Sequence, residues 1–459
     1  MRLSSSPKWN GQLLHRIVSP QETVKRIRPY LQKIGVTRLA DTTDLDTLGF
    51  PIFSAIRPTD MGGPDGISVY NGKGLTKADA EAGAMMEAVE RFCGEFWKHP
   101  LVTGTYDNLI AKGHFAMNPA TMYLQSLHEY RSDHDLEWVE GWDLLRDRTV
   151  LIPLNFVICP YRAETGHLWM QSSNGLASGN TLEEAICHAL TELIERDAYT
   201  IAMVRARLLP RIKALHTAMI TGTQFEDPGI DRTLYPSVEL STLPDSVAKL
   251  VKKAHKDKTQ VWLRNITSDL GIPTFVGSLQ RWESDGSELA AGGFGCHPNS
   301  TIAAIRAITE AAQGRNVQIQ GVREDINRAS VGATQFQRNK VIEGERVLWC
   351  ADSSTRLSFS DVPSFDHSNI LDDIQLMLSA LRNDGVQDVF VVDLSQPGIP
   401  ASVVRAIIPD MESWFLTEFK PDKCILGRRA KRYLDLSMRD RDDLDIVDSS
   451  MRAGIDLTS

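Results

Sequence analysis

Cysteine is scarce in this chain and is never paired at short range. The 459 residues include six cysteines: Cys93, Cys159, Cys187, Cys296, Cys350 and Cys424. None of them forms a C-x-x-C pair, which argues against a zinc ribbon, and six in so long a chain are too few for a disulfide scaffold. We therefore expect a protein whose thiols stay reduced.

Long apolar stretches and an excess of basic residues are also lacking. The N-terminus, "MRLSSSPKWNGQLLHRIV", has no apolar segment of the kind that a signal peptide needs, and no apolar run approaches the length that spans a bilayer. The net charge of -9 argues against nucleic acid as the main partner, because binders of phosphate backbones normally present a basic face. We expect a cytoplasmic protein that neither crosses a membrane nor binds nucleic acid.

The familiar nucleotide-binding motifs are missing as well. The sequence has no G-x-x-x-x-G-K-[ST] phosphate loop, no G-x-G-x-x-G opening a Rossmann helix, and no kinase H-R-D or D-F-G set. The short stretch "NGKG" at 71–74 carries no meaning by itself. If a nucleotide binds here, other side chains must hold it.

Strand-like and helix-like segments alternate along the chain, which predicts an α/β fold of mixed sheets with packed helices. Helices are expected near 19–34, 76–97, 181–205, 244–256, 301–318 and 371–385. The first should begin with Ser19 as its N-cap and Pro20 in its first turn. The length suggests two or three lobes. We place an N-terminal segment that contributes to a nucleotide site at 1–60, a main domain at 61–425 and a charged tail at 426–459.

Three of these helices share one internal repeat, in which an alanine, a second alanine four residues later and a glutamate three residues after that follow a glycine-containing loop. The three sets are Ala80–Ala84–Glu87, Ala185–Ala189–Glu192 and Ala303–Ala307–Glu310. Such positions lie on one helix face, where small alanines allow close packing. A further polar residue comes three positions later in each copy: Glu90, Glu195 and Gln313. A single copy is also common on solvated faces, but three matched copies favour one shared site.

Two of the helices carry E-x-x-E-R, with Glu87, Glu90 and Arg91 in one and Glu192, Glu195 and Arg196 in the other. Four converging carboxylates repel one another unless a cation lies between them. Mg²⁺ is the natural choice, since it prefers oxygen ligands and commonly shares them with a phosphate chain. Glutamate-bound Mg²⁺ with arginines close behind is typical of a nucleoside triphosphate site.

At this point the sequence resembles the YcaO family. The resemblance is carried by "GKGLTKADAEAGAMMEAVERF" (72–92), "SNGLASGNTLEEAICHALTELIERDA" (173–198) and "GGFGCHPNSTIAAIRAITEAAQGR" (292–315), and it extends from about residue 15 to about 430. It implies the ATP-binding fold of that family, ATP and Mg²⁺ as cofactors, and chemistry on a peptide backbone amide.

The resemblance also implies roles for individual residues. Glu87, Glu90, Glu192 and Glu195 match glutamates that hold Mg²⁺, and Asn180 and Glu184 match polar residues that face the metal and the phosphates. The implied metal set is thus Glu87, Glu90, Glu184, Glu192 and Glu195, with Glu87, Glu192 and Arg196 as the catalytic candidates. Arg196 matches a phosphate-side arginine, and Arg306, Glu310 and Gln313 match the third helix of the site. Arg16 and Thr23 keep the spacing of a basic residue and a hydroxyl that touch the nucleotide in relatives, although Thr23 could equally be an ordinary first-turn helix residue.

Other features point to a subgroup. The chain ends "AGIDLTS", so we expect neither the proline-rich C-terminus of azoline-forming members nor a leader-peptide-binding region before the domain. The segment "VVDLSQPGIPASVVRAIIPDMESWF" (391–415) resembles members found with a TfuA-type partner, which make thioamides. We expect a peptide or protein substrate, a TfuA-like sulfur-delivery partner and a homodimer. The alternatives are an azoline-forming cyclodehydratase, an accessory factor for methylthiolation of ribosomal protein S12, a plain ATP-dependent ligase, and a site that binds ATP only as a regulatory switch.

The resemblance further implies how such an enzyme acts. A nucleophile adds to the amide carbonyl carbon, and the resulting oxygen takes the γ-phosphoryl group of ATP. Loss of phosphate then leaves C=S or a C–N ring in place of C=O. Cys93 and Cys187, on the two E-x-x-E-R helices, are expected to be small buried core residues and not sulfur carriers.

Overall fold

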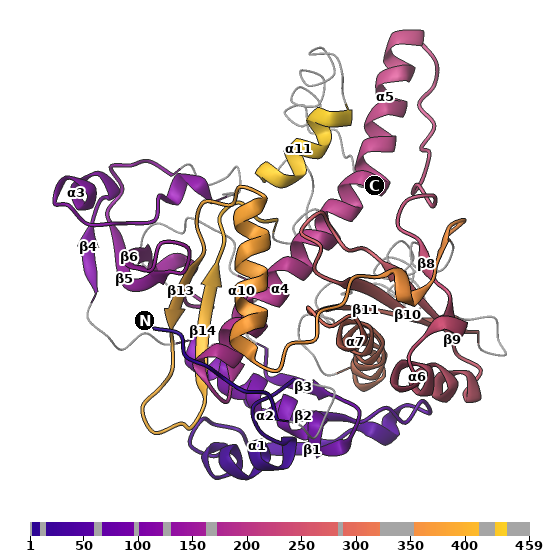
Figure 1. Cartoon of the computed structure of the whole chain (residues 1–459), viewed down its shortest axis with the longest axis horizontal. Helices are drawn as coiled ribbons and strands as arrows, with labels where there is room; N and C mark the ends of the chain where they lie inside the picture. Colours follow the sequence, from indigo (N-terminus) through magenta and orange to yellow (C-terminus); the bar gives the residue numbers. More distant parts are fainter. Residues whose placement is uncertain are drawn as a thin grey trace.

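A computed structural model describes residues 2–9, 15–58, 67–95, 101–122, 130–161, 172–282, 288–321, 353–412 and 427–437. Three sheets and the helices packed on them make up this part of the chain, which confirms the predicted mixed α/β class (Figure 1). The helices are α1 (Pro20–Ile27), α2 (Lys77–Gly94), α3 (Tyr106–Ala111), α4 (Leu182–Met203), α5 (Leu209–Thr221), α6 (Asp245–Lys256), α7 (Ser300–Gln320), α10 (Ile370–Asn383) and α11 (Arg428–Ser437).

Each sheet has its own strand order. The first sheet runs β1 (Arg38–Asp41), β2 (Ile52–Ile56), β3 (Val69–Lys73). The second runs β4 (Val102–Gly104), β5 (Leu136–Asp143), β13 (Phe390–Asp393), β14 (Ser402–Ile407), β7 (Leu176–Gly179), with β6 (Arg148–Pro153) pairing β5. The third runs β11 (Glu288–Cys296), β10 (Thr274–Trp282), β9 (Gln260–Asn265), β8 (Ser237–Val238), β12 (Arg356–Leu357). Strands distant in sequence therefore meet in the second sheet, where β14 lies between β13 and β7.

The helix starts follow the sequence signals. Ser19 caps α1 by accepting a hydrogen bond from the Glu22 amide at 3.1 Å. Thr76 and Asp79 form a reciprocal capping box at the start of α2, and each satisfies a backbone amide that a helix N-terminus leaves unpaired. The first helix is shorter than the expected 19–34, since regular α-helix ends at Ile27 and a 3₁₀ turn at Arg28–Tyr30 follows. Pro29 lies in that turn and cannot donate the backbone hydrogen bond that would continue the helix.

The segments predicted as glycine-containing loops before the three repeat helices are partly strands, so that prediction is wrong. β3, β7 and β11 end just before α2, α4 and α7, and each packs on the helix that follows it. A Cβ at Gly72 would lie 2.0 Å from the Ala80 carbonyl oxygen, and one at Gly295 would lie 2.0 Å from that of Ala303. The glycines are needed because strand and helix backbones touch here, and the repeated alanines are the other side of the same contact.

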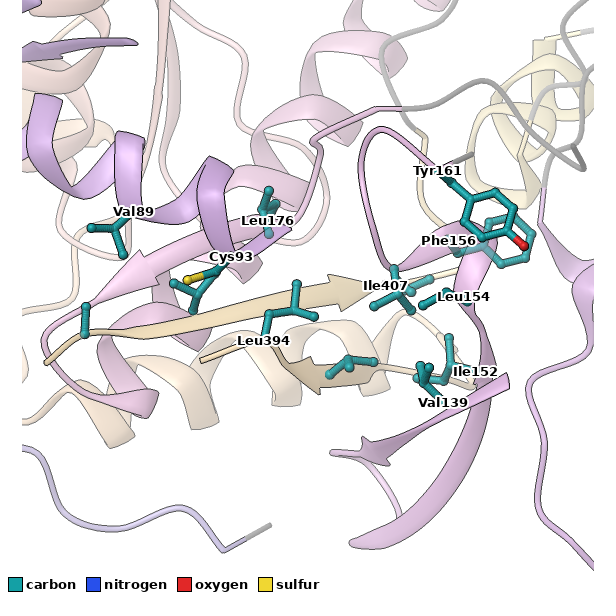
Figure 2. Close-up of a cluster of buried hydrophobic side chains, with 14 of the residues drawn as sticks. Val89, Cys93, Val139, Ile152, Leu154, Phe156, Tyr161, Leu176, Leu394 and Ile407 are labelled. Atoms are coloured by element: carbon teal, nitrogen blue, oxygen red, sulfur yellow. The ribbon is translucent and has the colours of Figure 1, made fainter. Parts of the chain in front are cut away.

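A large core cluster lies between the second sheet and α2, and Figure 2 draws part of it. Val89 and Cys93 of α2 belong to this cluster together with Leu176 of β7 and Ile407 of β14. Burying a side chain of this size contributes about 1.5–3 kcal/mol. The packing fixes α2 against β7, so the polar face of α2 is held in place.

The C-terminal part of the described chain is anchored in the interior. Arg429 of α11 is fully buried and bonds to Asp197 of α4 at 2.9 Å. The stretch 426–459 was expected to be a charged tail, and its residues 438–459 lie outside the described residues. The boundaries at 60 and 425 stay a prediction.

Candidate active site

One pocket of about 820 Å³ is lined by all the candidate site residues that the sequence analysis named. Its walls come from α2, α4, α7, β3 and the segment before α1, so the three repeat helices do converge. The predicted site residues lining it are Arg16, Thr23, Glu87, Glu90, Asn180, Glu184, Glu192, Glu195, Arg196, Arg306, Glu310 and Gln313.

The two E-x-x-E-R motifs have the same local geometry. On α2, Arg91 lies 3.8 Å from Glu87 and 4.0 Å from Glu90. On α4, Arg196 lies 3.6 Å from Glu192 and 3.8 Å from Glu195. In each helix one guanidinium therefore stands beside both carboxylates without a close contact to either.

Backbone amides orient these glutamates. Glu87 accepts a hydrogen bond from the Asn71 amide at 3.1 Å, and Glu192 accepts one from the Gly175 amide at 3.1 Å. Glu90 accepts from both the amide and the hydroxyl of Ser178, at 3.0 and 3.3 Å. Neighbouring strands and loops thus orient the carboxylates of Glu87, Glu90 and Glu192.

The N-terminal segment joins the site through Glu184. Its carboxylate accepts hydrogen bonds from Arg16 at 3.1 Å and from the Asn180 side chain at 3.1 Å. Thr23 donates to the Asn180 side-chain oxygen at 3.1 Å. Arg16 and Thr23, distant in sequence from α4, therefore lie in the pocket. Whether they touch a nucleotide stays a prediction.

The third repeat helix, α7, contributes a glutamate whose charge is paired with a lysine. Glu310 accepts a hydrogen bond from the Phe294 amide at 3.4 Å and forms an ion pair with Lys73 of β3. Gln313 donates to the Asn71 carbonyl at 2.6 Å. α7 is thereby tied to the same β3 segment that orients Glu87.

Several carboxyl groups in the pocket carry strongly perturbed pKa values. Burial raises the pKa of Glu90 to about 8, and the Glu87 and Glu192 charges add to this against the opposing charge of Arg91. Burial raises the pKa of Glu195 to about 7, with Glu310 adding to it against Arg196. Burial also acts on Glu310, but Lys73 and Arg196 outweigh it and hold its pKa below the ordinary value. Glu90 on α2 and Glu195 on α4 are therefore buried carboxyl groups whose negative charge the nearby arginines do not fully offset.

A divalent cation would supply the positive charge that these two carboxyl groups lack. The acidic donors are carboxylate oxygens, which suit Mg²⁺. Cys187 also lines the pocket, but burial raises the pKa of its thiol to about 12, so it stays protonated and is a poor metal ligand. Arg91, Arg196 and Arg306 line the same pocket and suit an anionic phosphate chain. The residues present thus fit a Mg²⁺-bound nucleoside triphosphate.

The sequence missed some residues of this pocket. Lys73 is the clearest case. It lies in the short stretch "NGKG", and nothing in the sequence indicated that it would pair with Glu310 of α7. His188 of α4 also lines the pocket, and burial together with the charges of Arg306 and Arg16 lowers its pKa well below the ordinary value, so it is neutral. Arg91 was identified as the last residue of the first E-x-x-E-R motif, but the sequence analysis did not predict that it would face a phosphate chain; it lines the pocket.

A histidine-rich cluster at the wall of the pocket has a simpler role. The ligand atoms of His15, His297 and Asp373 lie within metal-binding distance of one another. However, the Lys8 ammonium lies 2.6 Å from Asp373 and donates to His15 Nδ1 at 2.8 Å. The lysine already neutralises the carboxylate, so this cluster ties the N-terminal segment to α10.

Comparison with known proteins agrees with the geometry. A family model described as "YcaO cyclodehydratase, ATP- and Mg²⁺-binding" matches residues 71–412. The chain belongs to the YcaO family. The predicted cofactors, ATP and Mg²⁺, and the predicted ATP-dependent peptide-modifying enzyme are confirmed by this match. Of the two predicted types, thioamide synthetase and cyclodehydratase, the family description names the cyclodehydratase. No helix in the described part of this YcaO chain is both long and apolar enough to span a membrane.

Two relatives extend over most of the YcaO chain. An uncharacterized protein of Methanothermobacter thermautotrophicus is 34% identical and covers 90% of this chain and 98% of its own length. A protein of Rhizobium leguminosarum bv. trifolii, named for its place in the tfuA 3′ region, is 31% identical and covers 86% of this chain and 88% of its own length.

Solved structures show the same fold. A heterocyclase in complex with substrate and cofactor has a TM-score of 0.71 at 23% identity and covers 90% of this chain, which spans 54% of that heterocyclase. The YcaO protein of Methanopyrus kandleri bound with AMPPCP and Mg²⁺ has a TM-score of 0.66 at 21% identity, covering 90% of this chain and 96% of its own.

Proposed function

We propose that this protein activates a peptide backbone amide by ATP- and Mg²⁺-dependent phosphorylation of the carbonyl oxygen, most directly toward a thioamide product. The observation that carries the proposal is the convergence of the two E-x-x-E-R helices on one pocket in which burial raises the pKa of Glu90 and Glu195 despite the neighbouring arginines. An amide carbonyl is a poor electrophile, so making its oxygen a leaving group is the central difficulty, and bound Mg·ATP supplies the phosphoryl group for it.

The chain's own residues would divide this work by charge. Glu87, Glu90, Glu192 and Glu195, with Glu184, would hold the metal, since all five line the pocket. Backbone or side-chain donors orient the carboxylates of Glu87, Glu90, Glu184 and Glu192. Arg196, Arg306 and Arg91 would stabilise negative charge on the phosphates, including the charge that develops as phosphate departs. Arg16, Thr23 and Asn180 would position the nucleotide through the network around Glu184. Positioning would supply much of the rate enhancement.

Two observations favour sulfur as the entering atom. The segment 391–415 resembles the TfuA-associated subgroup, and the Rhizobium relative is named for its place beside tfuA. A sulfur-delivery partner of the TfuA type and a peptide or protein substrate follow from this assignment. A homodimer remains a prediction.

A second product has its own support. The family description reads cyclodehydratase and one structural relative is a heterocyclase. In that reaction the nucleophile would be a cysteine, serine or threonine side chain of the substrate, and the product an azoline.

Mass spectrometry separates the two products. The enzyme is incubated with ATP, Mg²⁺ and peptides encoded beside its gene, with and without added sulfide. Exchange of one oxygen for sulfur, dependent on sulfide, is the expected result. A loss of water that needs no sulfide would replace the thioamide assignment with the azoline one. Sulfide-dependent exchange that proceeds without ATP would contradict the activation step itself.

A further inference from the structure

The turn between β11 and α7 carries a buried histidine, His297. β11 ends at Cys296 and α7 begins at Ser300, so this histidine lies in the short connection between them (Figure 1). Its side chain is only 7% exposed, yet it lines the pocket together with Arg306 of α7. The third repeat therefore brings an imidazole to the pocket in addition to its charged side chains.

One hydrogen bond fixes which ring nitrogen of His297 carries the proton. The Asn299 backbone amide donates to His297 Nδ1 at 2.9 Å, and an atom that accepts a hydrogen bond must offer a lone pair. A neutral imidazole with its lone pair on Nδ1 carries its proton on Nε2. Asn299 is also the N-cap of α7, so the turn that starts the helix also sets the tautomer of the histidine.

The proton on His297 Nε2 has no hydrogen-bond acceptor among the described residues. His15 and Asp373 lie close to this ring, but Lys8 engages both, since it donates to His15 Nδ1 at 2.8 Å and lies 2.6 Å from Asp373. The His15 ring meets that of His297 edge to face, with 5.2 Å between the ring centroids. An N–H donor that lines a pocket without a protein partner is available to a ligand there.

The surroundings of His297 keep the imidazole uncharged. Burial lowers its pKa well below the ordinary value, and its neighbours lower it further: His15, Arg306, Lys8 and Arg16. A neutral imidazole donates a hydrogen bond without giving up its proton, and can therefore polarise an oxygen that must stay unprotonated. An imidazolium would instead act as an acid toward the same oxygen.

We propose that His297 is a catalytic residue, whose Nε2–H donates a hydrogen bond to the oxygen of the amide that reacts. This rests on the proposed function, which supplies the amide. The oxygen gains negative charge when the nucleophile adds, and it must keep a free electron pair to attack the γ-phosphorus. A neutral donor stabilises that charge without protonating the oxygen. The phosphates need full positive charge instead, which Arg91, Arg196 and Arg306 of the same pocket would supply.

With hydrosulfide as the nucleophile, the steps balance around this hydrogen bond. Sulfur forms a bond to the amide carbon, and the carbonyl π pair moves to the oxygen. That oxygen bonds to the γ-phosphorus as the bond to ADP breaks. The C–O bond then breaks, phosphate leaves with the electron pair and takes up the S–H proton, and C=S forms. His297 keeps its proton throughout, so it needs no reprotonation between turnovers.

Two substitutions separate this role from a structural one. A glutamine amide reaches about as far as imidazole Nε2, so His297→Gln keeps a donor toward the pocket and loses the acceptor for the Asn299 amide. The shorter asparagine reaches only as far as Nδ1, so His297→Asn keeps that acceptor and loses the donor. We expect His297→Asn to lower kcat for peptide modification about 10²-fold, and His297→Gln to retain most of it. The reverse order would show a structural role at the start of α7 and would overturn the proposal.

A matched control and a direct measurement complete the test. His367→Gln changes a histidine that contacts Asp373 and lies outside the pocket lining formed by the described residues, and its turnover should match the unmodified enzyme. An equal loss in this control, or an effect of His297→Asn confined to the KM for ATP, would overturn the proposal. NMR of the imidazole nitrogens, with the His297 signals assigned from their loss in His297→Gln, should show a neutral Nε2–H tautomer at about pH 7. An Nδ1–H tautomer or a charged ring would overturn it without any peptide substrate.

Failure of this inference and failure of the proposed function give different results. If the unmodified enzyme turns over and His297→Asn does so equally well, the proposed function stands and His297 is not catalytic. If the unmodified enzyme modifies none of the peptides encoded beside its gene, with or without sulfide, the proposed function fails. The assignment of the amide oxygen to His297 then fails with it, whatever tautomer the NMR measurement shows.

Discussion

The helices α2 and α4 differ from α7, although all three follow one repeat. In α2 and α4 the first glutamate is oriented by a backbone amide and the second is buried with its pKa raised, at about 8 for Glu90 and about 7 for Glu195. In α7 the glutamate is paired with Lys73, its pKa is lowered, and a glutamine takes the second place. The repeat therefore fixes position, while the neighbouring charges decide whether a helix offers a site for a cation.

The largest effect is expected from removing a carboxylate of α2 or α4. Glu87→Gln or Glu192→Gln should lower Mg·ATP turnover by about 10²–10³-fold, the range seen when a preorganised electrostatic group is lost. Circular dichroism should show an intact fold, because the amide keeps the shape of the side chain. Undiminished turnover in either variant would show that the metal assignment is wrong.

A smaller effect is expected from the cation that distinguishes α7. Lys73→Met leaves Glu310 without its partner, so its pKa should rise and turnover should fall by about tenfold, which corresponds to roughly 1.4 kcal/mol. The matched control is Lys77→Met, since Lys77 is exposed and pairs with Asp41 away from the pocket. Equal turnover in the two variants would contradict the prediction, because it would mean that Lys73 offsets the charge of Glu310 without affecting turnover.

The charge shortage on α2 also predicts how stability depends on pH. A carboxyl group whose pKa is raised in the folded state stabilises the fold below its unfolded pKa, and this is lost as pH rises through the folded value. Without ligand, the melting temperature should therefore fall between about pH 5 and pH 8, the window set by Glu90 and Glu195 together with Glu412, whose pKa burial also raises to about 8. Mg²⁺ with AMPPCP should reduce the fall, and Glu90→Gln should make it shallower without any ligand. A ligand-free pH profile that is the same in Glu90→Gln would contradict the assignment.

The smallest effect concerns a core thiol that α2 carries beside its acidic face. Cys93 is 1% exposed and packs in the cluster of Figure 2. Cys93→Ser should cost about 1–3 kcal/mol of stability, because a hydroxyl is buried in place of an apolar thiol. ATP turnover at 25 °C should not change. A persulfide trapped on Cys93 during turnover would reverse this assignment.

Local signals in the sequence located much of the fold. Ser19, Thr76 and Thr181 act as N-caps because a short polar side chain can satisfy a nearby backbone amide, an interaction within three residues. The strands β3, β7 and β11 were predicted as loops because their sequences contain glycines, which are typical of loops. Their glycines are explained only by the helix backbone that approaches them, and no local pattern records that distance.

The sequence by itself determined the family, the helix repeat and the acidic character of the site, since these depend on residue type and short spacing. The tertiary structure decided which charges are compensated. Lys73 and Glu310 are separated by 237 residues, and Arg405 reaches the Phe156 carbonyl across 249. Such pairs form because the three sheets bring distant strands beside the repeat helices, and the strength of each charge then depends on burial, which exists only once the chain has folded.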